Sequence, residues 1–358
     1  MKSFFKKYVP ISFIITLSLA AVSFILLNLC EKNAALADGV SDGVGAFLRR
    51  SMAALSNRLS FSLAELLVIL LVALIPLIIV IAFRLRTARG RVRLVLYIFS
   101  FAFFMYSWYA LSFGASYHTS AINDKMDFDT VKVDEESLDS LAVYLVGELN
   151  SLSNDLTLVD GESVMPYSLS EMSEKIVLAY DAFLADYPIF DNLSSSVKGV
   201  KLSELMAYGG ILGMYTYFSG EANLSVVYPD YCLPSAAIHE LAHQRGVARE
   251  DEANFLAYTV ASYSDDPYIR YSGCLSLFEY TVSALSKTNK ERVKQIYSSL
   301  GEIPLSDLNA YSEFYREHMN TPLRDISSFF NDTYLRANGT EGVVSYGRAI
   351  RLSLAFYK

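Results

Sequence analysis

Long apolar runs divide the sequence into two parts. Three runs within the first 113 residues carry no charge, at residues 11–29, 66–83 and 94–113. A helix needs about 20 apolar residues to cross a bilayer. Three such runs so close together predict a membrane domain over residues 1–113 with three transmembrane helices.

The second part, residues 114–358, is dominated by apolar positions three and four residues apart, the spacing of helices with one buried face. Residues 214–228 differ, because they are rich in Tyr, Val and Phe and predict a short β-hairpin. The fold class is therefore mainly α with a small β-sheet. Helices are predicted at residues 135–150, 168–187, 234–245, 250–264, 268–286, 288–299, 304–319, 322–337 and 342–356.

The distribution of basic residues predicts an orientation in the membrane. Lys2, Lys6 and Lys7 precede the first apolar run, and five Arg lie between residues 84 and 93, after the second run. Basic residues next to spans favour the cytoplasmic side. We expect a multi-pass cell-membrane protein with a cytoplasmic N-terminus and residues 114–358 outside. In an alternative interpretation, the first run is a signal peptide cleaved near residues 35–37.

Composition excludes several classes of protein. Residues 1–113 hold 12 Lys and Arg against 4 Asp and Glu, whereas residues 114–358 hold 18 against 34. An acidic outer part argues against nucleic-acid binding, which needs a basic face. The 25 Tyr and 22 Phe exclude disorder. Three Cys in 358 residues are too few for a disulfide framework, although Cys232 and Cys274 are both expected outside and could pair.

Residues 44–59 predict an amphipathic helix with two possible positions. It lies in the outer membrane interface, or it packs on the outer domain. Its apolar face is Phe47, Leu48, Met52, Leu55 and Leu59, and its polar residues include Arg49, Arg50 and Arg58.

The motif that carries chemistry is His239-Glu240-Leu241-Ala242-His243, an H-E-x-x-H sequence. On a helix, residues i and i+4 share a face, so both imidazoles reach one metal ion. Glu240 then addresses a water on that ion as general base, and the ion is expected to be zinc.

A catalytic zinc site needs a third protein ligand. After a turn at Gly246, a second helix presents Glu250 and Asn254 on one face. This E-x-x-A-N pattern predicts Glu250 as the ligand and Asn254 as its support, with Glu252 as the alternative ligand. An acidic helix start also stabilises the helix dipole without any metal.

Two further features bear on substrate binding. Arg270 and Tyr271 are candidates for stabilising the oxyanion of a tetrahedral intermediate, the alternative being a surface or packing role. The hairpin at residues 214–228 is a candidate edge strand for an extended peptide, the alternative being a packed hairpin.

Residues 239–255 resemble a bacterial membrane family called domain of unknown function 3810. Residues 61–65, 218–223, 270–273, 331–335 and 345–347 also resemble it. The resemblance implies a zincin-like metallopeptidase domain and says nothing about substrate. One departure is Leu233-Pro234-Ser235-Ala236, where a Pro-Phe-Thr run is usual, directly before the motif helix.

These observations together predict a membrane-anchored zinc metallopeptidase that acts on a peptide or protein outside the cytoplasm. Its alternatives are a zinc-stabilised receptor or scaffold without turnover, and a hydrolase of a non-peptide amide in the cell wall. No oligomeric state follows from the sequence.

Overall fold

The computed structural model describes residues 8–190, 192–340 and 346–357, and these are mainly helical, with small sheets. Lys2, Lys6, Lys7 and residues 342–345, with which the helix predicted at 342–356 starts, lie outside the described residues.

The chain divides into two compact units. The first comprises Met1–Ser120 together with Thr216–Gly220, and the second comprises Ala121–Tyr215 and Glu221–Lys358. The predicted boundary after Phe113 lies seven residues before Ser120, where the main segment of the first unit ends.

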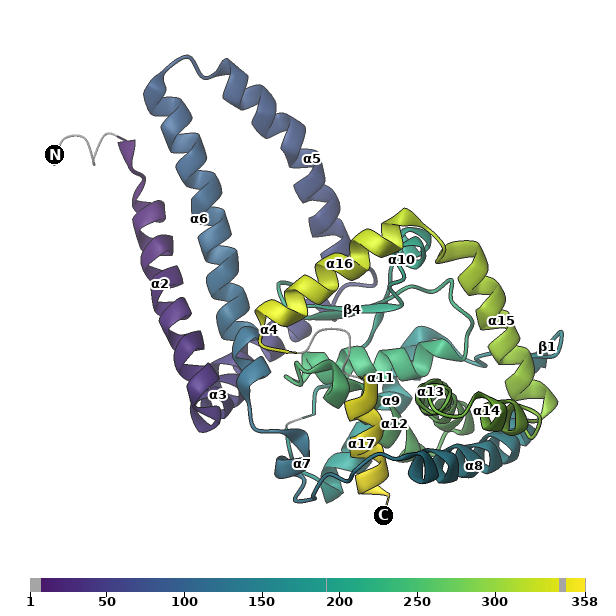
Figure 1. Ribbon diagram of the computed structural model, residues 1–358. Helices are drawn as coiled ribbons and strands as arrows, with labels where there is room; N and C mark the ends of the chain where they lie inside the picture. Colours follow the sequence, from purple (N-terminus) through teal and green to yellow (C-terminus); the bar gives the residue numbers. More distant parts are fainter. Residues whose placement is uncertain (1–7, 191, 341–345, 358) are drawn as a thin grey trace. The chain divides into compact units, whose positions relative to one another are not determined.

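Three helices of the first unit are long and apolar enough to cross a membrane. Two of them, α2 and α6, lie side by side (Figure 1). Within the third, α5, Ala64 is the buried residue, so almost the whole helix surface remains for contact with lipid. The predicted runs are confirmed as helices, each longer than its apolar run. Their bounds are Ile11–Lys32 for α2, Leu63–Arg84 for α5 and Ala88–Ser112 for α6.

The predicted amphipathic helix is present, but its faces are not those expected. Phe47 and Leu55 are exposed, whereas Arg49 is buried. The Arg49 guanidinium donates to the backbone carbonyls of Ser112, at 2.8 Å, and Ser41, at 3.1 Å. The expectation that Arg49 lies on an exposed polar face was wrong, because carbonyls of two other segments bind its guanidinium inside the unit. The elements of this region are α3 (Ala34–Val40), η1 (Ser41–Gly45), α4 (Ala46–Ser56) and η2 (Gly114–His118).

The second unit contains a counterpart of each of the nine predicted helices, displaced at the ends by a few residues. Side-chain caps explain several starts: Asp134 and Ser137 form a reciprocal capping box, and Asp266 caps a helix whose first residue is Pro267. The elements are α7 (Ile122–Lys125), α8 (Glu135–Leu152), η3 (Ser153–Asp155), α9 (Leu169–Asp186), α10 (Ser203–Tyr208), α11 (Cys232–Gln244), α12 (Glu250–Ser262), α13 (Pro267–Leu285), α14 (Lys290–Tyr297), α15 (Glu302–His318), α16 (Pro322–Ala337) and α17 (Tyr346–Phe356).

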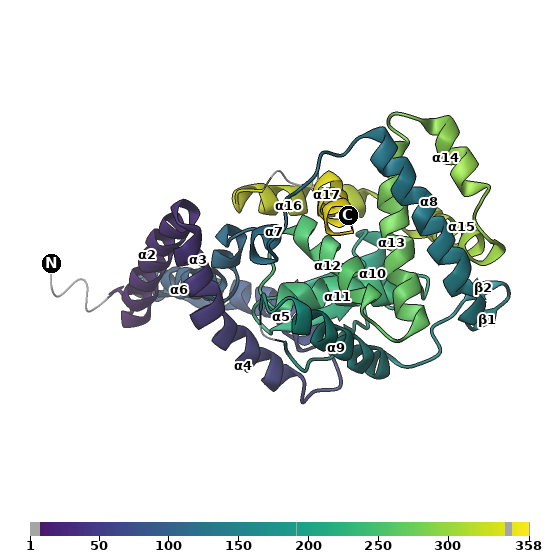
Figure 2. The same ribbon diagram turned by 90° about the horizontal axis from the view of Figure 1, so that it is seen from below.

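Helix α11 packs against α9, α12, α13 and a strand of the sheet, and eleven of its residues are buried. Helix α8 lies along α13 (Figure 2). Leu145 and Leu149 of α8 and Leu275 and Phe278 of α13 belong to one buried cluster. The motif helix is thus held from several sides, as a rigid site requires.

The sheet has three strands in the order β3-β5-β4, so β4 (Gly213–Thr216) is an edge strand. The predicted hairpin is present, but its strands stop at β5 (Glu221–Leu224) and do not reach Tyr228. Strand β3 (Lys198–Gly199), which runs parallel to β5, had no sequence signal because it is two residues long. A separate antiparallel pair joins β1 (Leu158–Val159) and β2 (Glu162–Ser163).

The three cysteines are free and buried. Cys274 Sγ lies 3.7 Å from the carbonyl oxygen of Leu145 and is held within the packing of α13 on α8. The suggested pairing of Cys232 with Cys274 is therefore absent.

Candidate metal centre

The two histidines of the motif lie on one face of α11. Ile238, Leu241 and Ala242 are fully buried, which fixes the rotation of the helix. With that face inside, His239 and His243 lie one turn apart, with ring centroids 4.6 Å apart and ring planes at 89°. Their Nε2 atoms are 3.0 Å apart.

A glycine turn brings the third residue to this pair. Helix α11 ends at Gln244, and Gly246 has φ +102°, a conformation that L side chains rarely adopt. The amide of Val247 donates back to Ala242 at 3.1 Å, which reverses the chain. Helix α12 then begins at Glu250 and packs against α11.

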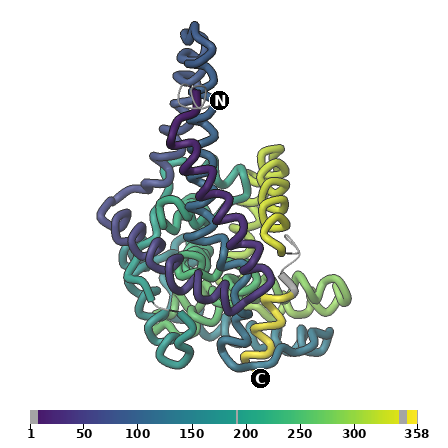
Figure 3. Tube along the Cα trace, turned by 90° about the vertical axis from the view of Figure 1, so that its left-hand side faces the viewer, coloured from purple at the N-terminus to yellow at the C-terminus, as the bar shows by residue number. Residues whose placement is uncertain are grey.

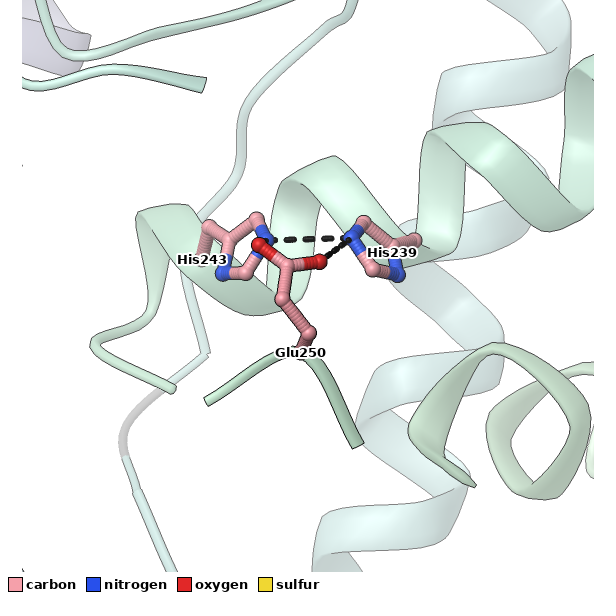
Figure 4. Close-up of side chains that lie close together, drawn as sticks. All are labelled: His239, His243 and Glu250. Carbon is pink, nitrogen blue, oxygen red and sulfur yellow. Dashed lines mark hydrogen bonds and ion pairs between the residues drawn. The ribbon is translucent and has the colours of Figure 1, made fainter. Parts of the chain in front are cut away.

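Figure 4 shows the Glu250 carboxylate facing both imidazoles. Its Oε2 lies 3.2 Å from His239 Nε2, and its Oε1 lies 3.6 Å from His243 Nε2. A tetrahedral ion with bonds of about 2.05 Å holds its ligand atoms about 3.3 Å apart. The three separations match that value within a few tenths of an ångström, so two imidazoles and a carboxylate fit a zinc ion.

The backbone orients His243 for this role. His243 Nδ1 donates to the carbonyl of Val247 at 2.6 Å, which leaves Nε2 facing the cluster. Burial by itself would lower the pKa of His243, but the carboxylates of Glu250 and Glu240 and the Val247 carbonyl together outweigh burial and raise this pKa to about 9. The histidines in turn hold the pKa of Glu250 well below its ordinary value despite burial. A divalent cation would replace the proton that this cluster attracts.

The cluster remains accessible from one side. The exposed fraction of the side chain is 15 % for His239 and 31 % for Glu250, against 8 % for His243. Water therefore reaches the cluster at Glu250 more easily than at His243.

Glu240 lies next to the cluster and is buried. Burial raises the pKa of Glu240, while the neighbouring histidines oppose this, and the Tyr215 backbone amide donates to its carboxylate. A Cβ placed on Gly213 would lie 2.5 Å from Glu240 Oε1. Strand β4 therefore runs directly against this carboxylate, and only a glycine leaves room for it.

The alternative ligand, Glu252, lies outside the cluster. Its Oε1 accepts from the Ile122 amide at 2.8 Å and from Arg249 Nη2 at 2.6 Å. These bonds hold the Glu252 carboxylate at the start of α7. Of the two candidates, only Glu250 belongs to the His-His-carboxylate group found among the described residues.

The three supporting candidates are placed differently from one another. Asn254 lies one turn after Glu250, and its Oδ1 is 3.5 Å from the Tyr280 hydroxyl. Tyr271 is fully buried, and its hydroxyl donates to Asp307 at 2.6 Å, so it belongs to the core and not to an oxyanion site. Arg270 Nε is buried without a hydrogen-bond partner.

Sequence reasoning missed the contacts that position α11 from behind. Arg245 stacks over the Tyr180 ring at 4.0 Å and donates to the carbonyls of Leu241 and Leu193, at 3.0 and 2.8 Å. The Tyr180 hydroxyl donates to the Ile238 carbonyl at 2.7 Å. The Arg245–Tyr180 and Tyr180–Ile238 contacts join segments far apart in the sequence, so no local sequence pattern predicts them.

A protein family described as "Protein of unknown function (DUF3810)" matches residues 41–354. The chain belongs to the DUF3810 family. The match includes α4, all of the second unit up to Leu354, and the His-His-carboxylate group of this DUF3810 chain. No curated protein and no solved structure gives a significant match.

Proposed function

We propose that this protein is a membrane-anchored zinc metallopeptidase of zincin type. The observation that carries the proposal is the triangle of His239, His243 and Glu250 with the buried Glu240 beside it. Two imidazoles and one carboxylate form the ligand set of catalytic rather than structural zinc, because they leave a position open.

A zinc ion held by these three residues would supply Lewis acidity, which makes water a nucleophile at neutral pH and polarises a carbonyl. The residues of the chain would do the rest. Glu240 accepts the proton of the attacking water and passes it to the leaving nitrogen. Burial supports the first of these steps, because a carboxylate with a raised pKa is a stronger base and accepts a proton more readily than an exposed one. Val247 keeps His243 in the tautomer that binds metal.

The proposed substrate is a peptide or protein outside the cytoplasm. Arg84 ends α5, and Arg89, Arg91 and Arg93 lie in the first turns of α6, so the link between these helices is strongly basic. Basic links favour the cytoplasm. Residues after α6 would then lie on the opposite side of the membrane, and the second unit with them.

The first test is metal content. Full-length protein in detergent is purified as wild type, Glu250→Gln and Glu252→Gln, supplied with zinc and measured by mass spectrometry. We expect about one zinc per wild-type or Glu252→Gln chain and a strong loss in Glu250→Gln. Equal zinc in all three proteins, or loss only in Glu252→Gln, would contradict the assigned ligands.

The second test is turnover. The zinc-loaded protein is incubated with a complex peptide mixture, and new termini are identified by mass spectrometry. Wild type is expected to cut peptide bonds and Glu240→Gln to lose at least about a hundredfold in rate at unchanged zinc content. Full zinc without any cleavage would favour a zinc-stabilised receptor or scaffold, and release of amides from cell wall but not from peptides would favour the non-peptide hydrolase.

A further inference from the structure

Helix α16 carries an exposed apolar surface that the proposed activity does not use. Ile326, Phe329 and Phe330 have exposed fractions of 53 %, 68 % and 65 %. Leu323 and Tyr334 extend the same stripe, since residues three, four and seven apart share a side of a helix. We call these five residues the α16 apolar face.

The opposite side of α16 fastens it to the second unit. Leu335 is its buried residue, Arg324 stacks over the Tyr315 ring at 4.7 Å, and Thr321 at the N-cap donates to the Tyr208 carbonyl at 2.6 Å. Figures 1 and 3 show α16, yellow-green, at the margin of this unit. The apolar face therefore points away from the contacts that hold the helix.

A helix with so little buried surface is expected to be only weakly stable when water alone surrounds its apolar face. Sixteen residues with one buried side chain gain little from packing, and most of the stability of protein helices comes from a buried apolar face. Large contiguous apolar surfaces on soluble domains usually mark a binding surface. We therefore expect the α16 apolar face, with its two adjacent Phe, to pack against an apolar partner.

The chain provides a bilayer as that neighbour. The second unit begins at Ala121, and eight residues separate it from Ser112, where α6 ends. Eight residues reach at most about 28 Å, and part of this stretch is coiled in η2, so the unit stays close to the membrane surface. Such a tether gives the lipid surface a very high effective concentration at α16.

The composition of α16 suits an interfacial position. Its apolar face holds Phe and Tyr side chains, which favour the boundary between headgroups and acyl chains. Its charged residues are Arg324, Asp325, Asp332 and Arg336, which cancel. Binding would therefore come from burial of apolar area and would not require anionic lipid.

We propose that the α16 apolar face lies in the interfacial layer of the leaflet at which α6 ends. The helix then acts as a second, peripheral membrane contact beyond the three spans. This proposal concerns how the second unit meets the bilayer, and it holds whether or not the metal centre is catalytic.

Depth-resolved fluorescence in the full-length protein tests the proposal. Ile326→Cys, Phe329→Cys and Phe330→Cys place a thiol on the apolar face, and Ser328→Cys places one on an exposed position of the other side of the helix. The three native thiols are buried, so an NBD label reacts with the new one. The labelled proteins are reconstituted in phosphatidylcholine vesicles.

We expect nitroxide lipid to quench NBD at positions 326, 329 and 330 at least about twofold more than at 328, with iodide in the water doing the reverse. Quenching by iodide equal to that at position 328 would overturn the proposal. Shielding from both quenchers would also overturn it and would indicate a protein contact, such as a second copy. Thermal unfolding identifies any variant that fails to fold, and the other positions then decide.

Discussion

At the scale of single residues, Glu240 is fixed by a neighbour that has no side chain. Gly213 on β4 approaches so closely that a Cβ would lie 2.5 Å from Glu240 Oε1 and 2.7 Å from its Cγ. Because Glu240 is buried, its carboxylate has little room to retreat. The position of the proposed general base thus depends on a residue 27 positions earlier in the chain.

We predict that Gly213→Ala displaces Glu240 without touching the metal ligands. Overpacking of this kind costs about 1–3 kcal/mol in the free energy of unfolding, and hydrolysis should fall at least about tenfold because the base moves. Zinc content should stay that of wild type. The matched control is Gly147→Ala, where a Cβ meets nothing within 4 Å. Unchanged turnover in Gly213→Ala would show that β4 does not set the position of Glu240.

The carboxyl group of Glu279 on α13 leads to a prediction about how the stability of the protein depends on pH. Burial raises the pKa of Glu279 from 4.5 to about 7, so the folded state prefers the protonated form. This contribution to stability is fully present below about pH 4.5 and is lost as the pH rises through 7. Glu279→Gln stays neutral, so it should be more stable than wild type at about pH 8.5, by up to about 3 kcal/mol, and gain nothing near pH 4.5.

Chemical unfolding at the two pH values measures this difference for Glu279. Glu291→Gln on α14 is the control, because the Glu291 side chain is exposed and the substitution removes only a surface ion pair with Lys294. The same gain in both variants, or a gain at low pH, would count against a neutral Glu279 in the folded protein.

At the scale of elements, the turn between α11 and α12 brings together the proposed metal ligands. Gly246 has φ +102°, and the reversal there sets Glu250 opposite the two histidines. We predict that Gly246→Val, which strains this backbone, lowers zinc affinity at least about tenfold and destabilises the fold by about 1–3 kcal/mol. Gly246→Asn should lose less, because Asn tolerates positive φ better than a β-branched residue. Zinc titration with a competing chelator measures both variants, and equal losses would contradict the backbone argument.

In the first unit, Arg49 connects elements that are distant in sequence. It donates to carbonyls at the end of α6 and the start of η1 from inside the unit. We predict that Arg49→Lys lowers the free energy of unfolding by about 2–4 kcal/mol, since an ammonium lacks the planar fork that reaches both carbonyls. Arg50→Lys, at an exposed position of the same helix, should stay within about 0.5 kcal/mol of wild type. Thermal unfolding in the same detergent compares the two.

At the scale of the whole molecule, metal binding and folding should be coupled. Glu250 and the histidines come from two helices joined by a turn, so an ion that binds all three stabilises only the folded chain. We predict that zinc at about a thousandfold excess over its Kd adds about 4 kcal/mol to the stability of wild type, and that a chelator removes it. Glu250→Gln should respond weakly to either treatment. A melting temperature that zinc raises equally in both proteins would indicate binding elsewhere.

Much of the architecture could be predicted because it is local. Apolar runs of bilayer length, helical spacing, and caps such as Asp134 and Asp266 each act within a few residues. Three helices long enough to cross a membrane and counterparts of the nine further helices could therefore be predicted. Strand β3 escaped prediction because its two residues pair with β5, 25 positions away. The burial of Arg49 escaped it because the carbonyls that bind Arg49 lie on other elements.

The sequence by itself determined that His239 and His243 share a helix face, because spacing i to i+4 does so on any helix. It left Glu250 and Glu252 as rival ligands, since both stand in the first turn of α12. Only the tertiary structure decided which of the two carboxylates faces the histidines. Packing of α12 on α11 directs Glu250 to the histidines, while the amide of Ile122 and the guanidinium of Arg249 hold Glu252 elsewhere. Which way a carboxylate turns depends on partners that the chain brings together only when it folds.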